Sequence, residues 1–307
     1  MTAEWIAVDW GTTNLRVWIM GPNGVVVDHL SSDQGMGALT PAAFEPALLA
    51  LIDGYLSPDH VTPVFCCGMV GARQGWAEAP YVSVPTKPAQ YDQALAVPSA
   101  DSRISVHILP GLSQSHPADV MRGEETQIAG YLAQNPDFDG VLCLPGTHSK
   151  WAHISAGEVV SFKTYMTGEL FALLSKGSVL RHSLGRPDWD NNDWDNDAFI
   201  TAVDHSYARP QSVAGDLFSI RARDLLVGTS AGQARAGLSG SLIGLELAAA
   251  RPYWLGQQVV LIGAPAMVAI YDRALGHLGA MVARHSGDDV TLAGLCAAYQ
   301  MFKDAKS

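Results

Sequence analysis

Residues 8–19, VDWGTTNLRVWI, decide the fold class of this 307-residue chain. An apolar strand ends at Asp9, a turn contains Gly11, Thr12 and Thr13, and a second apolar strand follows the turn. A glycine turn between strands exposes backbone N–H groups, and neighbouring hydroxyls add hydrogen-bond donors. The stretch therefore predicts a hairpin whose turn binds phosphate. Asp9 is placed to hold Mg²⁺, which commonly uses one or two carboxylates together with substrate phosphates.

A second stretch, GVLCLPGTHSKWAHI at 140–154, repeats the pattern of strand, glycine turn and strand. Either turn alone is explained as well by an ordinary hairpin, because a single glycine turn is a weak signal. Two such turns at matching places indicate two similar halves that each bind phosphate. Lys150 either neutralises phosphate charge or lies on an outer strand edge in water. The other candidates for phosphate binding in this turn are Gly146, Thr147, His148 and Ser149.

Strands and helices alternate along the rest of the chain. Helical spacing of apolar residues predicts helices at 40–56 and from 123 onward, and a strand, glycine turn and helix at 258–279. A short helix over 291–302 closes the chain. This order predicts an α/β protein built from two similar halves.

The composition narrows the classes of partner and compartment. A net charge of −11 argues against nucleic acid or an anionic membrane surface as the main partner, because both need clustered cations. No apolar export segment precedes Asp9, and Cys66, Cys67, Cys143 and Cys296 lack a metal-binding spacing. We therefore expect buried thiols in a cytoplasmic protein.

An acidic segment, DWDNNDWDNDAF at 188–199, has the carboxylate spacing of a calcium loop. Counted from Asp193, Asp195 and Asp197 are in place, but Ala198 stands where such a loop needs glycine. We favour a solvated loop that caps the helix beginning at Ala198.

Longer motifs carry a resemblance to a known family. VDWGTTNLRV and LPGTHSKW look like the two phosphate motifs of the sugar kinase, Hsp70 and actin superfamily, and VVLIGAPAMVAIY (259–271) looks like its adenosine motif. Over nearly the whole chain, further motifs resemble the 2-dehydro-3-deoxygalactonokinase family. These are GMVGARQGWAEAPY (68–81), MRGEETQI (121–128), PGTHSKW (145–151), TYMTGELFALL (164–174) and LSGSLIGLE (238–246).

The resemblance implies a fold and a reaction. The implied fold is α/β, with two ribonuclease-H-like lobes (the actin-like ATPase fold) and an active-site cleft between them. The implied reaction is transfer of the γ-phosphoryl group of ATP, with Mg²⁺, to the 6-hydroxyl of 2-dehydro-3-deoxy-D-galactonate in galactonate breakdown. We expect residues 1–122 to bind the sugar acid and phosphate, completed by the helix at 291–307, and residues 123–290 to bind the nucleotide.

The attacking hydroxyl needs a carboxylate that orients it and accepts its proton. Glu124 and Glu125 begin a predicted helix, and only one of two consecutive helical residues easily faces a cleft. We favour Glu124, by analogy with the catalytic glutamate of polyphosphatases of the same superfamily. Asp9 is the alternative base. For one of the two glutamates, a purely structural role at the positive end of the helix is expected.

The substrate carboxylate calls for a cation, and a guanidinium suits it. Arg73 in a glycine-rich loop is the first candidate and Arg122 the second; either could instead form a structural ion pair. Backbone groups of Gly35, Met36 and Gly37 would contact the sugar, although glycines also simply make turns.

Adenine needs an apolar slot, and Gly263 with Ala264 at a strand end would let the ring lie against backbone. We expect residues 239–246 to line the other side. Another 2-keto-3-deoxy sugar acid as substrate, and a phosphohydrolase of the same superfamily, remain alternatives. The sequence leaves the oligomeric state open, and a homodimer is compatible with it.

Overall fold

The computed structural model describes residues 2–185 and 194–306. The chain forms two compact units. Unit 1 comprises Met1–Asp139, Ile154–Phe162 and Ser286–Ser307, and unit 2 comprises Gly140–His153 and Lys163–His285. The functional lobe boundaries expected at 122/123 and 290/291 remain predictions. Residues 188–193 of the acidic segment lie outside the described residues.

Unit 1 is built on a six-stranded sheet and a small three-stranded sheet. The large sheet has the order β3 (Val26–Ser32), β2 (Leu15–Met20), β1 (Trp5–Trp10), β4 (Thr62–Gly68), β7 (Ile104–Ile108), β6 (Leu95–Val97). The first three strands form an antiparallel meander, whereas β4 is parallel to β1 and β7 is parallel to β4. The small sheet contains β5 (Tyr81–Ser83), β8 (Gly111–Ser115) and β9 (Ala118–Met121).

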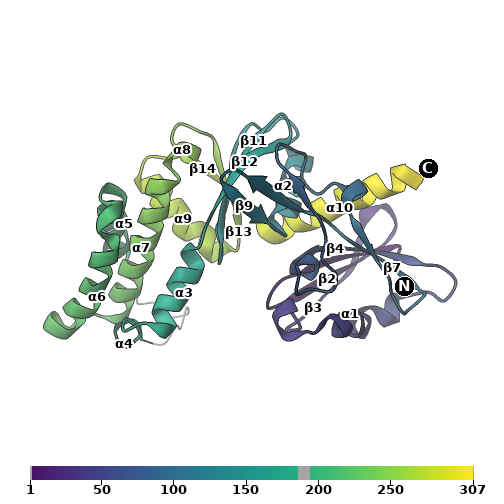
Figure 1. Ribbon diagram of the computed structural model, residues 1–307, viewed down its shortest axis with the longest axis horizontal. Helices are drawn as coiled ribbons and strands as arrows, with labels where there is room; N and C mark the ends of the chain where they lie inside the picture. Colours follow the sequence, from purple (N-terminus) through teal and green to yellow (C-terminus); the bar gives the residue numbers. More distant parts are fainter. Residues whose placement is uncertain (1, 186–193, 307) are drawn as a thin grey trace. The chain divides into compact units, whose positions relative to one another are not determined.

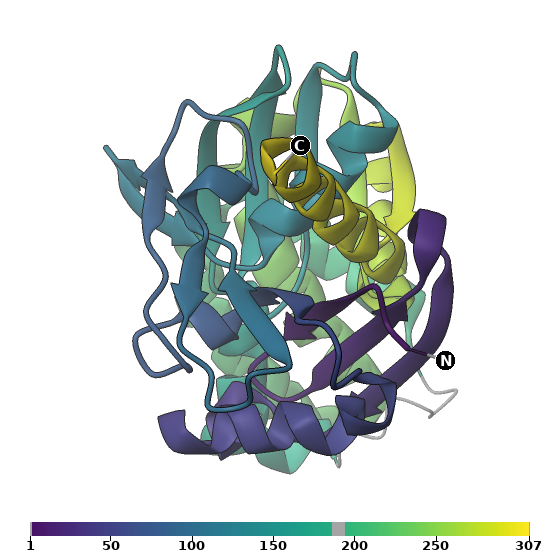
Figure 2. The same cartoon turned by 90° about the vertical axis from the view of Figure 1, so that its right-hand side faces the viewer.

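Side chains of β1 alternate between two covered faces of the large sheet. Ile6, Val8 and Trp10 belong to the cluster that includes α1 (Phe44–Ile52). Trp5 and Ala7 belong to the cluster that includes α10 (Gly287–Lys306), the yellow helix that ends at the C-terminus in Figure 2. Burial on both faces explains why the strand is apolar up to its end.

Helix α2 (Glu124–Gln134) packs closely against α10 through glycines. A Cβ atom on Gly130 would lie 1.8 Å from the carbonyl oxygen of Val290, and one on Gly294 would lie 2.0 Å from that of Thr126. Both positions therefore require glycine, because any side chain would separate the helices. The two helices belong to unit 1.

A five-stranded sheet, most of which belongs to unit 2, repeats the strand sequence of unit 1. Its order is β12 (Glu158–Tyr165), β11 (Ser149–Ser155), β10 (Gly140–Leu144), β13 (Val259–Gly263), β14 (Val282–Ser286), and β10 and β13 are parallel. The order β3-β2-β1-β4-β7 in the first sheet thus corresponds to β12-β11-β10-β13-β14 in the second. The predicted α/β fold with two similar halves is confirmed.

Seven α-helices of unit 2 are described; Figure 1 shows three of them, α5, α6 and α7, side by side. They are α3 (Thr167–Gly177), α4 (Arg181–Leu184), α5 (Asn196–Ala208), α6 (Val213–Val227), α7 (Ala231–Ala249), α8 (Arg251–Trp254) and α9 (Pro265–His277). Asp195 caps α5, accepting a hydrogen bond from the amide of Ala198 at 2.9 Å, which confirms the predicted capping role. Across the described ranges, no helix combines the length and the hydropathy needed to cross a membrane.

Candidate active site

Asp9 lies near the end of β1, and strand alternation places its side chain on the face that α10 covers. The antiparallel register sets Asp9 opposite Arg16, whose guanidinium binds both the Asp9 carboxylate and Asp288 at the start of α10. Only 14% of the Asp9 side chain is exposed. Burial raises the pKa of the Asp9 carboxyl, and the charge of Arg16 offsets part of that rise. The carboxylate is thus held in a fixed, partly accessible place.

The turn after Asp9 is clamped by the loop at 35–37. The amides of Gly35, Met36 and Gly37 donate to the carbonyl oxygens of Thr13, Gly11 and Thr12 at 3.1, 2.9 and 2.9 Å, respectively. A Cβ on Gly35 would lie 2.3 Å from the carbonyl carbon of Thr13, so glycine permits the contact. The sequence suggested that the backbone of this loop contacts a sugar. In the structure its three amides instead donate hydrogen bonds to the turn.

The clamp leaves the tip of the turn open to a ligand. Thr12 and Thr13 are exposed. Within residues 2–185 and 194–306, neither of them donates its amide to a backbone carbonyl. Two amides and two hydroxyls at this tip can therefore bind an anion.

Glycine contacts join Asp9 to the start of α2. Gly68, at the end of β4, has a φ of 88°, and a Cβ there would lie 3.2 Å from Asp9 Oδ1. Gly123, just before α2, has a φ of 106°, and a Cβ there would lie 3.3 Å from the Cα of Gly68. Only glycine tolerates these conformations readily. The structure thus brings Asp9 and the two candidate glutamates to one region of unit 1.

The two glutamates differ in accessibility. Glu125 is fully buried, and its two carboxylate oxygens accept hydrogen bonds from the amide of Gly123 at 2.8 and 2.7 Å. Burial, assisted by the charge of Glu124, raises the pKa of Glu125 to about 8. Glu124 is half-buried and accepts from the amide of Arg122 at 3.1 Å. Glu124 is therefore the one that solvent and a ligand can reach.

The two candidate arginines also lie in different environments. The Arg73 side chain is 79% exposed and pairs with Glu78 at 3.3 Å. Arg122 is 9% exposed, donates to the carbonyl oxygen of Ala79 at 2.7 Å and lies 4.2 Å over the ring of Tyr81. Among the described residues, Nη1 of Arg122 finds no hydrogen-bond partner. The structure thus associates Arg122, and not Arg73, with a buried positive charge near α2.

In unit 2, the second predicted turn lies against the start of α3. Thr147 and His148 are exposed, whereas Ser149 and Lys150 are buried, so Lys150 does not lie on an outer edge in water. The amide of Glu169 donates to the carbonyl oxygen of Thr147 at 2.9 Å, and His148 Nε2 lies 2.6 Å from a carboxylate oxygen of Glu169.

The approach of α3 to this turn depends on another glycine. A Cβ on Gly168 would lie 2.3 Å from the carbonyl oxygen of Gly146. The positive end of the α3 dipole is therefore held near the turn, which favours an anion there.

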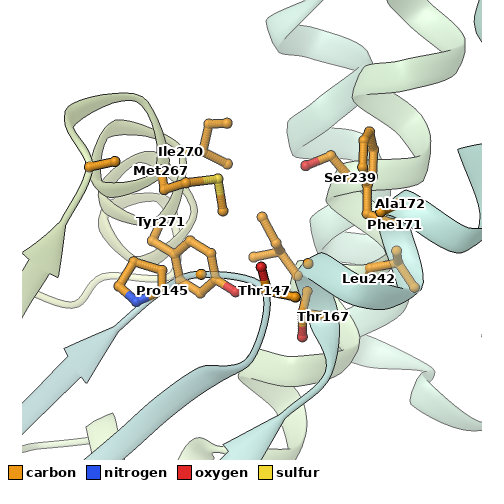
Figure 3. Close-up of a pocket in the computed structure, with 14 residues that line it drawn as sticks. Pro145, Thr147, Thr167, Phe171, Ala172, Ser239, Leu242, Met267, Ile270 and Tyr271 are labelled. Atoms are coloured by element: carbon orange, nitrogen blue, oxygen red, sulfur yellow. The ribbon is translucent and has the colours of Figure 1, made fainter. Parts of the chain in front are cut away.

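A cavity of about 390 Å³ opens beside this turn within unit 2 (Figure 3). Side chains of α9 form one side and those of α3 and α7 the other, with Thr147 and Thr167 between them. The lining residues are mostly apolar: Pro145, Gly146, Thr147, Thr167, Gly168, Phe171, Ala172, Ser239, Leu242, Ile243, Ala264, Met267, Ile270 and Tyr271. An apolar slot with a few polar groups suits a flat heterocycle.

The cavity contains the residues expected around adenine and several that were not expected. Ala264 lines it, while Gly263 lies one position before it at the end of β13; part of the segment 239–246 forms the opposite wall. Sequence reasoning assigned no site role to α3, although TYMTGELFALL was itself noted as a motif. Arg16 and Asp288 were also missed, because nothing local in the sequence links them to Asp9.

The part of the chain that the structure describes contains no group of three or more His, Cys, Asp or Glu side chains able to hold a metal ion. A divalent ion at Asp9 would therefore need ligands from a substrate and from water. Mg²⁺ is commonly bound in that way, with one or two carboxylates, phosphate oxygens and several waters.

Comparison with known proteins shows which family the chain belongs to. A family model described as 2-keto-3-deoxy-galactonokinase matches residues 9–298. The protein named "Probable 2-dehydro-3-deoxygalactonokinase DgoK1" of Rhizobium meliloti (strain 1021) is 40% identical over 301 residues, 95% of this chain and 95% of that protein. The 2-dehydro-3-deoxygalactonokinase of Escherichia coli (strain K12) is 34% identical, with 96% and 97% of the two chains covered.

Solved structures agree with these sequence matches. A crystal structure from Sinorhizobium meliloti, of a protein named for the same kinase, superposes with a TM-score of 0.87 at 38% identity and covers 97% of this chain and 99% of that one. The activator of the 2-hydroxyisocaproyl-CoA dehydratase from Clostridium difficile, with bound ADPNP, has a TM-score of 0.51 at 12% identity, covering 98% and 97%. The second likeness concerns the fold alone.

Proposed function

Because the chain belongs to the 2-keto-3-deoxy-galactonokinase family, we propose how its residues transfer the γ-phosphoryl group of ATP to the 6-hydroxyl of 2-dehydro-3-deoxy-D-galactonate. The enzyme is a phosphotransferase with an alcohol acceptor. Phosphoryl transfer needs positioning and charge stabilisation more than covalent chemistry from the protein. Each candidate residue is therefore assigned to one of these two tasks.

The adenine ring occupies the cavity of unit 2, and this apolar cavity beside a glycine turn is the observation that carries the proposal. Its volume of about 390 Å³ lies within the range of small-molecule sites. The turn at Gly146–Lys150 and the start of α3 bind phosphate oxygens through backbone amides and positive charge. His148 and Lys150 contribute hydrogen-bond donors, and the backbone of Gly263 and Ala264 lies against the ring.

The tip of the first turn binds the β- and γ-phosphates, of which the γ-phosphoryl group is transferred. Thr12 and Thr13 are exposed there, and Gly11 lets the chain turn. Asp9 fits Mg²⁺, since it is a partly accessible carboxylate directly before the exposed turn. Mg²⁺ bound there would neutralise negative charge on the β- and γ-phosphates.

Glu124 accepts the proton of the 6-hydroxyl. It is accessible, whereas Glu125 is buried and bonded to the start of its own helix. The nearby Asp9 is already paired with Arg16, which lowers its capacity as a base. Of the three carboxylates, Glu124 therefore best meets the requirement for an accessible group within reach of a substrate.

The carboxylate of the sugar acid is neutralised by Arg122, two positions before Glu124 in the chain. A buried guanidinium nitrogen without a partner is costly, and an anion nearby would lower that cost. Arg73 stays in its exposed pair with Glu78. Gly35, Met36 and Gly37 support the sugar site indirectly, by holding the first turn in place.

The test is an ADP-release assay with Mg·ATP and a panel of 2-keto-3-deoxy sugar acids, including the gluconate analogue. ADP should form with the galactonate acid and much less with its stereoisomer, because a polar site that loses a hydroxyl contact discriminates strongly. Equal release without any sugar acid would show a hydrolase and contradict the proposal. We expect the reaction to take place in the cytoplasm, and sedimentation would distinguish a monomer from the homodimer that the sequence allows.

A further inference from the structure

Glu246 is a buried acidic residue of α7 without a role in the reaction described above. It is 2% exposed and lies in unit 2. One carboxylate oxygen, Oε1, accepts a hydrogen bond from Trp151 Nε1 at 2.8 Å. The other, Oε2, accepts from the hydroxyl of Tyr271 at 2.7 Å and from the hydroxyl of Thr167. Three donors from three separate elements thus converge on one carboxylate.

The network extends to the phosphate-binding turn. The hydroxyl of Tyr271 also lies 2.8 Å from Ser149 Oγ. A phenol carries a single proton, and the Tyr271 proton is donated to Glu246. Ser149 must therefore donate its proton to Tyr271. The chain of hydrogen bonds runs from Ser149, directly after the turn, through Tyr271 to Glu246.

The residues of this network either line the cavity or lie on the strand next to it. Thr167 begins α3, Tyr271 lies on α9, and both line the cavity, as Figure 3 shows. Ser149 and Trp151 lie on β11, the strand that follows the turn. Glu246 itself does not line the cavity. It accepts hydrogen bonds from side chains of α3, α9 and β11 on the side of these elements that faces away from the cavity.

Burying a carboxylate in a protein core costs free energy, because the charged group loses its hydration. Burial raises the pKa of Glu246, and the hydrogen bonds from its donors offset only part of that rise. Apolar residues of similar volume often stabilise a core as well as buried ionic groups do, or better. Packing alone therefore does not explain a glutamate here, whereas fixed positions for three polar partners do.

We infer that Glu246 is the positioning residue of the nucleotide site: it holds Thr167, Tyr271 and the strand after the phosphate-binding turn in the arrangement that receives ATP. The inference rests on the proposed function, because it takes the cavity to be the nucleotide site. It predicts a selective effect on nucleotide affinity, since Glu246 touches neither the base at α2 nor the sugar-acid site of unit 1.

Glu246→Gln is the central variant. Glutamine has nearly the same shape, but it is neutral, and its NH₂ group replaces one of the two acceptor oxygens. The hydroxyls of Tyr271 and Thr167 then lose the carboxylate oxygen that accepts from them and must reverse their hydrogen bonds or move. The dissociation constant of Mg·ADP, measured by titration calorimetry, and the KM for ATP should both rise about tenfold, in line with the loss of a hydrogen bond to a charged group. The KM for the sugar acid should not change, and kcat should stay within about threefold.

A pair of tryptophan variants separates positioning from general stability. Trp151 and Trp254 are both buried, and each donates its indole N–H at 2.8 Å, Trp151 to Glu246 and Trp254 to the carbonyl oxygen of Leu247. Neither lines the cavity. Trp151→Phe should weaken Mg·ADP binding several-fold, whereas Trp254→Phe should lower the melting temperature without weakening binding. This comparison also decides the question if Glu246→Gln does not fold.

Each failure has a distinct signature. If the unaltered enzyme does not bind Mg·ADP, the proposed function is wrong. If it binds Mg·ADP and both Glu246→Gln and Trp151→Phe bind equally well, the inference about Glu246 is wrong. Equal weakening by Trp151→Phe and Trp254→Phe would also overturn it, because a common loss of stability would then account for both.

Discussion

Each half of the fold holds a carboxylate near its glycine turn, partly accessible in Asp9 and buried in Glu246, but the two carboxylates have opposite kinds of partner. Asp9 in unit 1 is paired with the cation Arg16, which itself is shared with Asp288. Glu246 in unit 2 is surrounded by neutral donors. The Asp9 carboxylate lies near an exposed turn, whereas both oxygens of the Glu246 carboxylate accept hydrogen bonds from buried protein groups. One duplicated fold can thus bind phosphates and metal in one half and shape an apolar cavity in the other.

Asp9→Asn is expected to have the largest effect on this comparison. The amide cannot supply charge for Mg²⁺ or for Arg16, so kcat/KM should fall by about 10³-fold. The measurement is ADP release at saturating Mg²⁺. Asp288→Asn is the matched control, because Asp288 binds the same guanidinium but is 59% exposed; it should change the rate less than about threefold. Comparable losses in both variants would contradict the assignment of Asp9.

The adjacent glutamates contrast a half-buried, accessible carboxylate with a fully buried one. Glu124→Gln removes the proposed base and should lower kcat by about 10²-fold with little change in the KM for ATP. Single-turnover measurements would separate the chemical step from product release. A larger loss of kcat in Glu125→Gln than in Glu124→Gln would assign the base to Glu125 instead.

Glu125→Gln should show instead in stability against pH. In the folded protein Glu125 has a pKa of about 8, above its ordinary value of 4.5. Between these values the folded state keeps a proton that the unfolded state has lost, so the stability of the unaltered protein falls as pH rises from 5 to 8. The slope from this group is on the order of 1 kcal/mol per pH unit. Urea unfolding at several pH values should show a flatter dependence for Glu125→Gln, and parallel curves would disprove the raised pKa.

The arginines are expected to give the smallest effect. Arg122→Lys keeps a charge but loses the planar guanidinium, and the KM for the sugar acid should rise about tenfold while the KM for ATP is unchanged. Arg73→Lys, at the exposed pair with Glu78, should change neither constant. The reverse result would restore Arg73 as the cation that binds the substrate.

Much of the fold could be predicted because its signals are local. The hairpin at Trp5–Met20 follows from strand alternation around a glycine turn, and the duplicated halves follow from the repetition of that pattern at Gly140–Ser155. The cap at Asp195 and the close crossing at Gly130 and Gly294 were also visible in residue type and spacing.

Other features could not be predicted because they join distant segments. Arg16 meets Asp288 across 272 positions, and Trp151 meets Glu246 across 95. Arg73 was the first candidate because of its glycine-rich loop, and sequence position does not reveal that its side chain is exposed while Arg122 is buried. The glycines at 35 and 37 were linked to a sugar, yet their close approach is to the first turn.

The sequence by itself determined the α/β class, the two glycine turns, the family and hence the chemistry, because each depends on short runs of residues. Tertiary structure alone decided which carboxylate is exposed, which arginine is buried and what lies behind the cavity wall. The physical reason is that burial, charge pairing and pKa depend on the atoms that surround a group in space. Glu124 and Glu125 are neighbours in the sequence, and the fold places one within reach of solvent and the other in the interior.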